Sequence, residues 1–252
     1  MIPVELWDLE LREGLLWNAM QDSRLTDALA EAAGHLADGT ARTRSGTPIP
    51  DESRNFEAVW LAGGHAERVD TDRLADAIER PVWQTADPQA VSAHGAAALA
   101  PDAHRLAVVD LGQSHLKGFT ADRRTIVPRP WDRLPMREDC TDPLPVARGA
   151  LRAWVGPALA SLEADPDVVI VALPCELHDD PTPGGCSYAG LQDDDDFIPD
   201  MLARARWCPD TVWVLNDAEL AAAAARQDPR TRGISTLVLT LGFGIGAAVL
   251  LP

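Results

Sequence analysis

Four residues between positions 107 and 120 have the types and the spacing to hold a cation and an anion. An apolar run carries Asp110 near its end and breaks into Gly112, which predicts a buried strand that enters a tight turn. The pattern Asp-x-Gly-x-Ser-x-x-Lys continues through Ser114 and Lys117. A carboxylate at a strand end can hold hydrated Mg²⁺, and a tight turn offers backbone N–H groups and a hydroxyl to phosphate oxygens. A strand that ends in Asp-x-Gly is also typical of an ordinary hairpin, so both interpretations stay open.

A second glycine-rich turn lies in residues 236–252. The sequence TLVLTLGFGIGAAVLLP predicts a strand, a turn that contains Gly242, Gly244 and Gly246, and a second strand. The Gly-x-Gly-x-Gly pattern is weak by itself. Because a strand follows it in place of a helix, the pattern argues against a dinucleotide-binding turn.

A polar pair, Asn216 and Asp217, joins a predicted strand to a predicted helix. The strand covers residues 212–216, and an Ala-rich helix follows over residues 219–226. Asn and Asp are good residues for a helix N-terminus, so capping alone would account for the pair.

Glycines also punctuate residues 58–100. A buried strand over 58–62 ends in Gly63 and Gly64, and a helix-like segment and a short strand follow. Gly95 lies in the small-residue helix start SAHGAAALA. Glycine turns let a flat ring approach the backbone because no Cβ is in the way. A plain strand–turn–helix connection is the alternative.

Composition and charge limit the class of partner. The 252 residues include 22 basic and 39 acidic side chains, which gives a net charge of −17. This charge opposes binding to nucleic acid, to anionic membranes and to long polyanions. The N-terminus lacks a basic region and an apolar signal core, so we expect a cytoplasmic protein. The acidic run at 193–196 predicts a solvent-exposed loop more strongly than a metal site.

These four glycine-rich or polar segments resemble those of the ROK family of glucokinase-like sugar kinases, within the actin-like ATPase superfamily. Residues 110–117 are similar to its first phosphate loop, 242–246 to its second, 216–218 to its Asn-Asp-Ala motif and 58–100 to its adenosine segment. The resemblance implies an α/β protein of the actin-like ATPase (ribonuclease H-like) fold, with two lobes around a nucleotide cleft. One lobe would cover 101–217, and a discontinuous lobe would cover 1–100 plus 218–252.

The resemblance also implies a role for each residue. Asp217 would be the general base, Asn216 and Glu5 would hold the sugar, and Asp110 would hold Mg²⁺ through water. The phosphates of ATP would be bound by Gly112, Ser114, Lys117, Gly242, Gly244 and Gly246. The adenosine would be bordered by Gly63, Gly64 and Gly95. The negative charge of the chain favours ATP over polyphosphate as the phosphoryl donor.

The order of the segments differs from that of the family, because the adenosine segment here precedes the first phosphate loop. The chain is therefore interpreted as circularly permuted. Joining AAVLLP to MIPVELWDLE would give a strand, a turn and a strand, with Glu5 at the family's sugar-binding glutamate. Phe243 replaces the threonine of the second phosphate loop, and Asp8 replaces the sugar-site histidine.

The leading hypothesis is ATP-dependent phosphorylation of a hexose or related sugar. The alternative is a non-catalytic nucleotide- or sugar-binding module with a regulatory or assembly role, which the two replaced residues favour. The expected partners are small molecules, and neither nucleic acid nor a membrane. The sequence leaves open whether the chain forms a homodimer.

Overall fold

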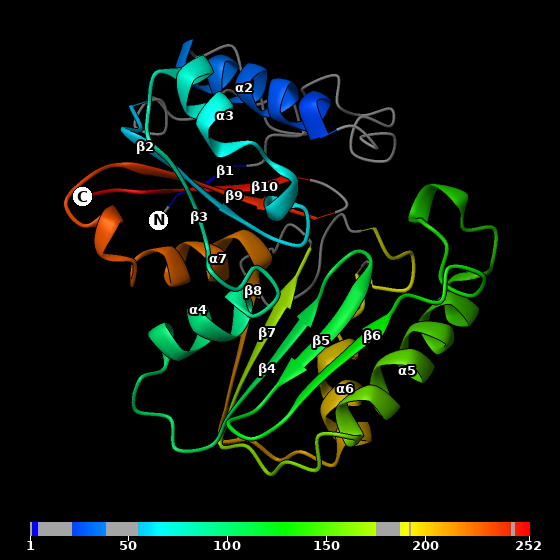
Figure 1. Ribbon diagram of the computed structural model, residues 1–252. Helices are drawn as coiled ribbons and strands as arrows, with labels where there is room; N and C mark the ends of the chain where they lie inside the picture. The colour runs from blue at the N-terminus through cyan, green and yellow to red at the C-terminus, as the bar shows by residue number, and fades with distance from the viewer. Residues whose placement is uncertain (1, 5–21, 39–54, 175–186, 192, 243–244) are drawn as a thin grey trace. The chain divides into compact units, whose positions relative to one another are not determined.

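The computed structural model describes residues 2–4, 22–38, 55–174, 187–191, 193–242 and 245–252. The chain divides into two compact units (Figure 1). Unit 1 contains residues 1–95 and 218–252, and unit 2 contains residues 96–217. Each unit is built around its own sheet.

The described strands of unit 2 form a five-stranded sheet in the order β6-β5-β4-β7-β8. Strands β4, β5 and β6 form an antiparallel meander, whereas β4, β7 and β8 are parallel. The bounds of the strands are Leu106–Leu111 (β4), His115–Phe119 (β5), Arg124–Pro128 (β6), Val168–Leu173 (β7) and Thr211–Asn216 (β8).

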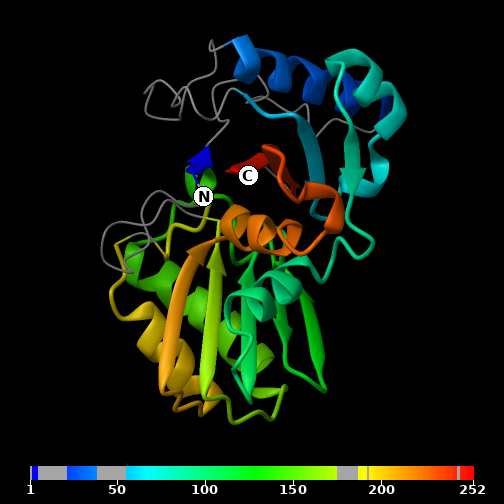
Figure 2. The same ribbon diagram turned by 90° about the vertical axis from the view of Figure 1, so that its left-hand side faces the viewer.

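Helices α5 (Leu144–Ala160) and α6 (Phe197–Ala205) cover one face of this sheet (Figures 1 and 2). Strand β7 is a continuous apolar run and β4 is apolar apart from Asp110, because parallel strands in the middle of a sheet are buried on both faces. Alternate residues of these strands pack against the apolar stripes of the two helices. The edge strand β6 alternates between exposed and half-buried residues, as an edge strand does. A 3₁₀ turn, η4 (Arg137–Asp139), precedes α5.

The described strands of unit 1 also form a five-stranded sheet, in the order β1-β10-β9-β2-β3. Strands β1, β10 and β9 are antiparallel, whereas β9, β2 and β3 are parallel. The bounds of the strands are Ile2–Val4 (β1), Ala58–Ala62 (β2), Val82–Gln84 (β3), Thr236–Leu241 (β9) and Ile245–Leu250 (β10).

The sheet of unit 1 is covered on both faces (Figure 1). Helices α2 (Asp22–Asp38) and α3 (Thr71–Ile78) pack on one face, with the 3₁₀ turn η3 (Ala66–Arg68). Helix α7 (Asp217–Ala225) packs on the other through its alanines, and α4 (Val91–Leu99) contributes Val91 to the same cluster. Small side chains on α7 allow its backbone to approach the sheet closely.

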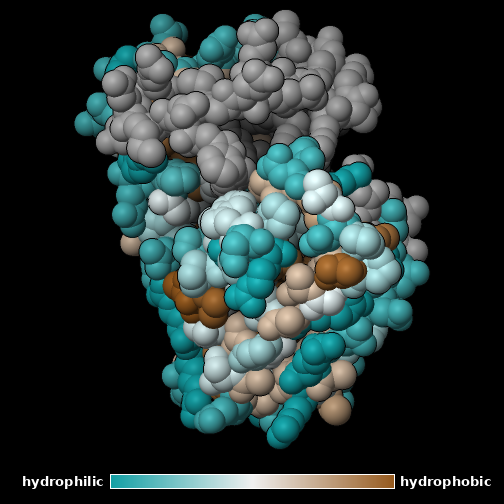
Figure 3. Space-filling view, turned by 90° about the vertical axis from the view of Figure 1, so that its right-hand side faces the viewer, coloured by the Kyte–Doolittle hydropathy of each residue, from teal (hydrophilic) through white to brown (hydrophobic). Residues whose placement is uncertain are grey.

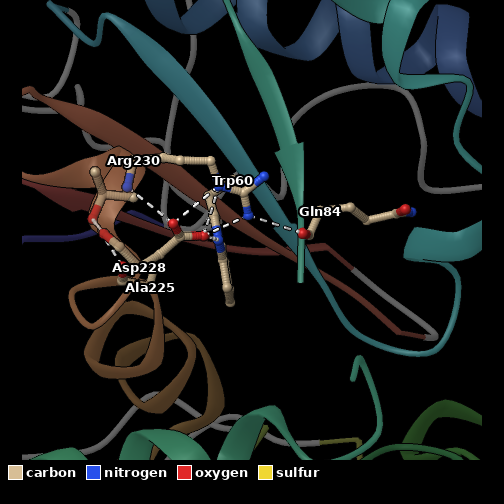
Figure 4. Close-up of polar contacts among 6 residues, drawn as sticks. Trp60, Gln84, Ala225, Asp228 and Arg230 are labelled. Atoms are coloured by element: carbon tan, nitrogen blue, oxygen red, sulfur yellow. Dashed lines mark hydrogen bonds and ion pairs between the residues drawn. The ribbon is translucent and has the colours of Figure 1, made fainter. Parts of the chain in front are cut away.

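A polar cluster ties the segment after α7 to strands β2 and β3 (Figure 4). The carboxylate of Asp228 accepts a hydrogen bond from Trp60 Nε1 at 3.1 Å and pairs with Arg230 of the 3₁₀ turn η5 (Pro229–Thr231). Arg230 also donates to the carbonyl of Gln84 and stacks on Trp83. The Arg230 guanidinium and the other contacts lower the pKa of Asp228 to about 2.

The two sheets share one topology. Each has an antiparallel run of three strands, and its first strand is also parallel to two further strands. In unit 2 the three antiparallel strands are β4, β5 and β6, which follow one another in the chain. In unit 1 they are β9, β10 and β1, so the third strand comes from the start of the sequence. The predicted α/β class is confirmed, and this strand order is that of the actin-like, ribonuclease H-like units. Within the described residues, no helix is both long and apolar enough to cross a membrane.

Among the residues that are coloured in Figure 3, hydrophilic side chains are interspersed with hydrophobic ones. The hydrophobic side chains form small patches that are separated by polar residues. Small separate patches are normal for a protein surface and indicate no particular partner.

Candidate functional site

The hairpin of β4 and β5 brings together two of the predicted phosphate-site residues. Asp110 and Lys117 lie opposite each other in the ladder, and Lys117 Nζ is 3.1 Å from Asp110 Oδ2. Asp110 is only 6% exposed. The pair therefore places a fixed carboxylate and a fixed ammonium group at the carboxyl end of β4, where both charges are partly shielded from water.

The turn of this hairpin contains the other two residues. A Cβ at Gly112 would lie 3.2 Å from the carbonyl oxygen of His115, so a larger residue would require this oxygen to move by a few tenths of an ångström. Ser114 Oγ lies 3.0 Å from His115 Nδ1. Burial and the neighbouring Lys117 ammonium lower the pKa of His115, so this imidazole is neutral at physiological pH. His115 thus adds no charge to the turn.

Two residues that the sequence did not single out hold this turn from behind. Arg129 is 2% exposed, and its Nη1 donates to the carbonyl of Gln113 at 3.0 Å. The hydroxyl of Tyr188 donates to the carbonyl of Gly112 at 2.6 Å. Arg129 lies between two prolines, an unusual setting for a buried arginine, and this was the only signal in the sequence. Tyr188 comes from a remote segment, and nothing local indicated its place.

Asn216 and Asp217 lie at the same end of the parallel strands as Asp110, the carboxyl end. Strands β4, β7 and β8 are parallel, with Asp110 beside Ala172 and Leu173 beside Asn216 in the register. Asp110 and Asn216 therefore lie two strands apart, roughly 10 Å. Helix α7 begins at Asp217, so Asn216 occupies the N-cap position and the carboxylate of Asp217 lies in the first turn, where the helix dipole favours a negative charge.

The second glycine-rich turn connects β9 and β10. Gly242 directly follows β9, and Gly246 pairs with Thr240 in the ladder. The Thr240 hydroxyl is buried, and among the described residues it has no hydrogen-bond partner. Gly244 and Phe243 lie outside the described residues, as does the predicted sugar-binding residue Glu5.

The turn after β2 packs against the start of this second turn. Gly63 has a φ of +88°, and a Cβ there would lie 2.5 Å from the carbonyl oxygen of Leu241. The backbone N–H of His65 donates to the same oxygen at 3.0 Å. The predicted adenosine and second phosphate segments are therefore neighbours in unit 1. Gly64 is exposed, and among the described residues no atom lies within 4 Å of a Cβ placed there.

Gly95 has a packing role that is independent of any ligand. A Cβ on Gly95, in α4, would lie 2.0 Å from the carbonyl oxygen of Leu220, in α7. The two helix backbones meet at this point, and no residue larger than glycine fits between them.

The acidic run is solvent-exposed, as predicted, at Asp193, Asp195 and Asp196, and differs from the expectation at Asp194. Asp194 is 2% exposed, and its Oδ2 forms an ion pair with Arg152 Nη1 at 2.8 Å. Arg152 also contacts Asp200 at 2.6 Å and so joins α5 to α6 and the run before it. The loop prediction is wrong for Asp194 because the arginine on α5 compensates its buried charge. The described residues contain no group of three or more His, Cys, Asp or Glu side chains that could hold a metal ion.

Comparison with known proteins gives distant structural likenesses. No protein-family model matches the sequence, and no curated protein is significantly similar to it. An inorganic polyphosphate/ATP-glucomannokinase from Arthrobacter sp. strain KM is 23% identical, with a TM-score of 0.41, and the match spans 58% of each chain, less than two thirds of that enzyme. A ROK hexokinase from Thermus thermophilus is 16% identical over 82% of this chain and 86% of that one, with a TM-score of 0.42. A PPX-GPPA enzyme from Aquifex aeolicus is 10% identical over 60% of this chain and 50% of that one, with a TM-score of 0.34. Likenesses at this level do not assign the chain to a family.

Proposed function

We propose that the protein is a sugar kinase of the ROK type, which transfers the γ-phosphoryl group of ATP to a hydroxyl of a hexose or related sugar. The observation that carries this proposal is the Asp110–Lys117 pair beside a tight glycine turn, at the same sheet edge as Asn216 and Asp217. A fixed ammonium group beside a phosphate turn and a separate carboxylate at a helix start are the parts that phosphoryl transfer requires.

The candidate site residues of unit 2 each have a role in the proposed reaction. Lys117 neutralises negative charge on the phosphates, and the backbone N–H groups of the turn after Gly112 bind phosphate oxygens. Asn216 orients the acceptor sugar. The acceptor hydroxyl oxygen forms the new bond to the γ-phosphorus while the bond to the β–γ bridging oxygen breaks and ADP leaves. The hydroxyl proton passes to the carboxylate of Asp217.

Asp110 fits a magnesium role that is mediated by water. Its Oδ2 contacts Lys117, and its Oδ1 lies on the side of Gly112, 3.6 Å from the position of an added Cβ. Mg²⁺ usually keeps several waters and is held in proteins by one or two carboxylates together with substrate phosphates. When bound, it would supply additional positive charge for the transferred group.

The segments of unit 1 complete the proposal. Gly242, Gly244 and Gly246 bind further phosphate oxygens, and the turn of Gly63 and Gly64 borders the adenosine. The contact between Gly63 and Leu241 supports this assignment, because it joins the two segments. Gly95 is retained only as a neighbour of the adenosine, since its close contact with Leu220 already accounts for the glycine.

The proposal includes a permuted order of the segments. Its support is the pairing of β1 with β10, in which Ile2 lies opposite Val249 and Val4 opposite Ala247. This places the segment at residues 2–4 in the third position of the sheet, which β6 occupies in unit 2. This pairing is what a permuted order would require, because the strand that follows β10 in the unpermuted order would occupy the same place in the sheet.

The test replaces Asp217 by Asn and measures both ATP turnover with a panel of hexoses and ATP affinity. Because Asn cannot accept the proton, turnover should fall by roughly 10²- to 10⁴-fold while ATP affinity is retained. The matched control is Asp210→Asn, which makes the same change of charge at the opposite, exposed end of β8 and should leave turnover unchanged.

Two results would count against the kinase. Unchanged turnover in Asp217→Asn would remove the general-base role and leave Asp217 as a residue of the helix start. Absence of turnover in the parent protein across the whole sugar panel, together with measurable binding of nucleotide or sugar, would favour the non-catalytic binding module.

A further inference from the structure

The turn between β4 and β5 has three consecutive backbone carbonyls that are held by donors. The hydroxyl of Tyr188 donates to the carbonyls of Gly112 at 2.6 Å and Gln113 at 3.3 Å. Arg129 Nη1 donates to the carbonyl of Gln113 at 3.0 Å, and the backbone N–H of Arg129 donates to the carbonyl of Ser114 at 2.8 Å. Two residues thus fix the direction of the whole turn.

Arg129 is itself rigidly held. Its Nε donates to the carbonyl of Leu134 at 2.6 Å, and its Nη2 donates to the carbonyls of Pro135 and Ser187. The guanidinium group stacks on the ring of Tyr188, with 3.9 Å between Arg129 Cζ and the ring centroid. A planar donor fork whose nitrogens all reach acceptors cannot rotate without losing several hydrogen bonds at once.

The charge of Arg129 also acts on the turn. No carboxylate of the described residues forms an ion pair with Arg129, and its hydrogen bonds go to neutral carbonyls. Arginine stays protonated in proteins. The carboxylate of Glu138 acts on this charge from beyond ion-pair distance, so a positive charge held by neutral acceptors lies directly behind Gly112 and Gln113.

Because the peptide bond is planar, the contacts that hold these carbonyls also fix the direction of the N–H groups. The C=O and N–H of one planar trans peptide point in opposite directions. The carbonyls of Gly112 and Gln113 point toward Tyr188 and Arg129, so the N–H groups of Gln113 and Ser114 point away from them.

We propose that Tyr188 and Arg129 are positioning residues that orient the N–H groups of Gln113 and Ser114 toward a phosphate group of the bound nucleotide. This inference rests on the proposed function for the identity of the ligand and adds two residues to its phosphate site. Neither residue touches the phosphate. They act by holding the carbonyls on the opposite side of the turn and by placing a positive charge behind it.

The experiment compares binding of ATP, tripolyphosphate and adenosine to the full chain by calorimetry. Tyr188→Phe removes one hydroxyl and keeps the ring that stacks on Arg129. It should weaken ATP and tripolyphosphate binding by about tenfold, since the one hydroxyl proton that the two carbonyls share is lost, and leave adenosine binding unchanged. Arg129→Lys keeps a charge but loses the fork, and it should weaken the same two ligands more.

The control is Trp131→Leu, which removes the second ring that stacks on Arg129 and leaves the Tyr188 hydroxyl in place. It should keep the parent's affinity for ATP. A merely structural role for Tyr188 would lower all three affinities together, or lower the melting temperature with no change in the preference for ATP over adenosine.

The inference is overturned if Tyr188→Phe binds ATP as tightly as the parent, or if it loses ATP and adenosine equally. It is also overturned if the parent binds neither ATP nor tripolyphosphate. These results are separate from the kinase proposal, because a parent that binds ATP but phosphorylates no sugar refutes only the kinase, and the affinities of the variants still decide the role of Tyr188.

Discussion

Replacing Gly95 by Ala separates the packing role of this glycine from a ligand role. The added Cβ would lie 2.0 Å from the carbonyl oxygen of Leu220, whereas real Cβ atoms do not approach other heavy atoms within 3.0 Å. The clash is with backbone, so no side chain can rotate away from it. Helices α4 and α7 must move apart by about 1 Å or more to accept the methyl group, and the small-residue packing beside it then opens.

The size of the effect is the difference between two opposing terms. Overpacking of this kind costs about 1–3 kcal/mol or more, and the better helix propensity of Ala returns about 1 kcal/mol. The direct contact with backbone places the cost at the upper end, so we expect a net loss of about 2 kcal/mol. For a chain of this size that lowers the melting temperature by roughly 4–8 °C.

The chain offers a matched control in Gly149, which lies in α5. Gly149 is exposed, and no described atom lies within 4 Å of a Cβ placed there. Gly149→Ala should therefore gain about 0.5–1 kcal/mol from helix propensity alone. Urea unfolding of the parent and both variants measures the two free energies. A Gly95→Ala variant as stable as the parent would refute the close helix contact, and one that is stable but loses ATP affinity would restore the adenosine role.

Two further changes test the ion pairs of the two units. Asp228→Asn should lower the free energy of unfolding at neutral pH by about 1–2 kcal/mol, less than a pKa of about 2 implies, because Arg230 is half exposed. The folded pKa of Asp228 lies below its ordinary value of 3.8, so its contribution is present above about pH 4 and is lost as the pH falls toward 2. Urea unfolding from pH 2 to 7 should show this loss in the parent and little of it in the variant; equal curves would refute it. Arg152→Met should destabilise by up to about 3–5 kcal/mol, because the buried Asp194 then keeps only its longer contact with Arg148, at 3.7 Å, and Arg152→Met with Asp194→Leu should recover much of that loss in the same assay.

The elements that carry the candidate site could be predicted because their signals are local. The apolar run before Gly112 is a strand, the segment at 58–62 is a strand with the predicted bounds, and the strand predicted at 212–216 begins one residue earlier, at Thr211. The strands at 58–62 and before Gly112 are buried on both faces, which requires apolar runs, whereas the strand at 212–216 lies at the sheet edge and is half-buried. The turn at Gly63 could also be predicted from the sequence, because a turn with positive φ tolerates few residues other than glycine.

The contacts that support the site could not be predicted because they join residues far apart in the chain. Tyr188 reaches Gly112 across 76 residues, and Arg152 reaches Asp194 across 42. The residue type alone does not distinguish a buried aspartate from an exposed one. Only the arginine that faces it distinguishes the two, and that partner is set by the packing of α5 beside α6. The same reasoning applies to Gly95, whose neighbour Leu220 belongs to a helix that follows it by more than a hundred residues.

The two candidate phosphate turns occupy equivalent places in their sheets, which the sequence alone does not reveal. The turn after β4 joins the first and second strands of the unit 2 sheet, and the turn after β9 joins the first and second strands of the unit 1 sheet. In each unit the first strand is also parallel to the next strand of the sheet, β7 or β2. Both turns therefore leave the carboxyl ends of parallel strands, which is where open α/β sheets bind their ligands. The equivalence places both glycine-rich patterns at the same kind of position, the connection that leaves the carboxyl end of a parallel strand and enters an antiparallel one.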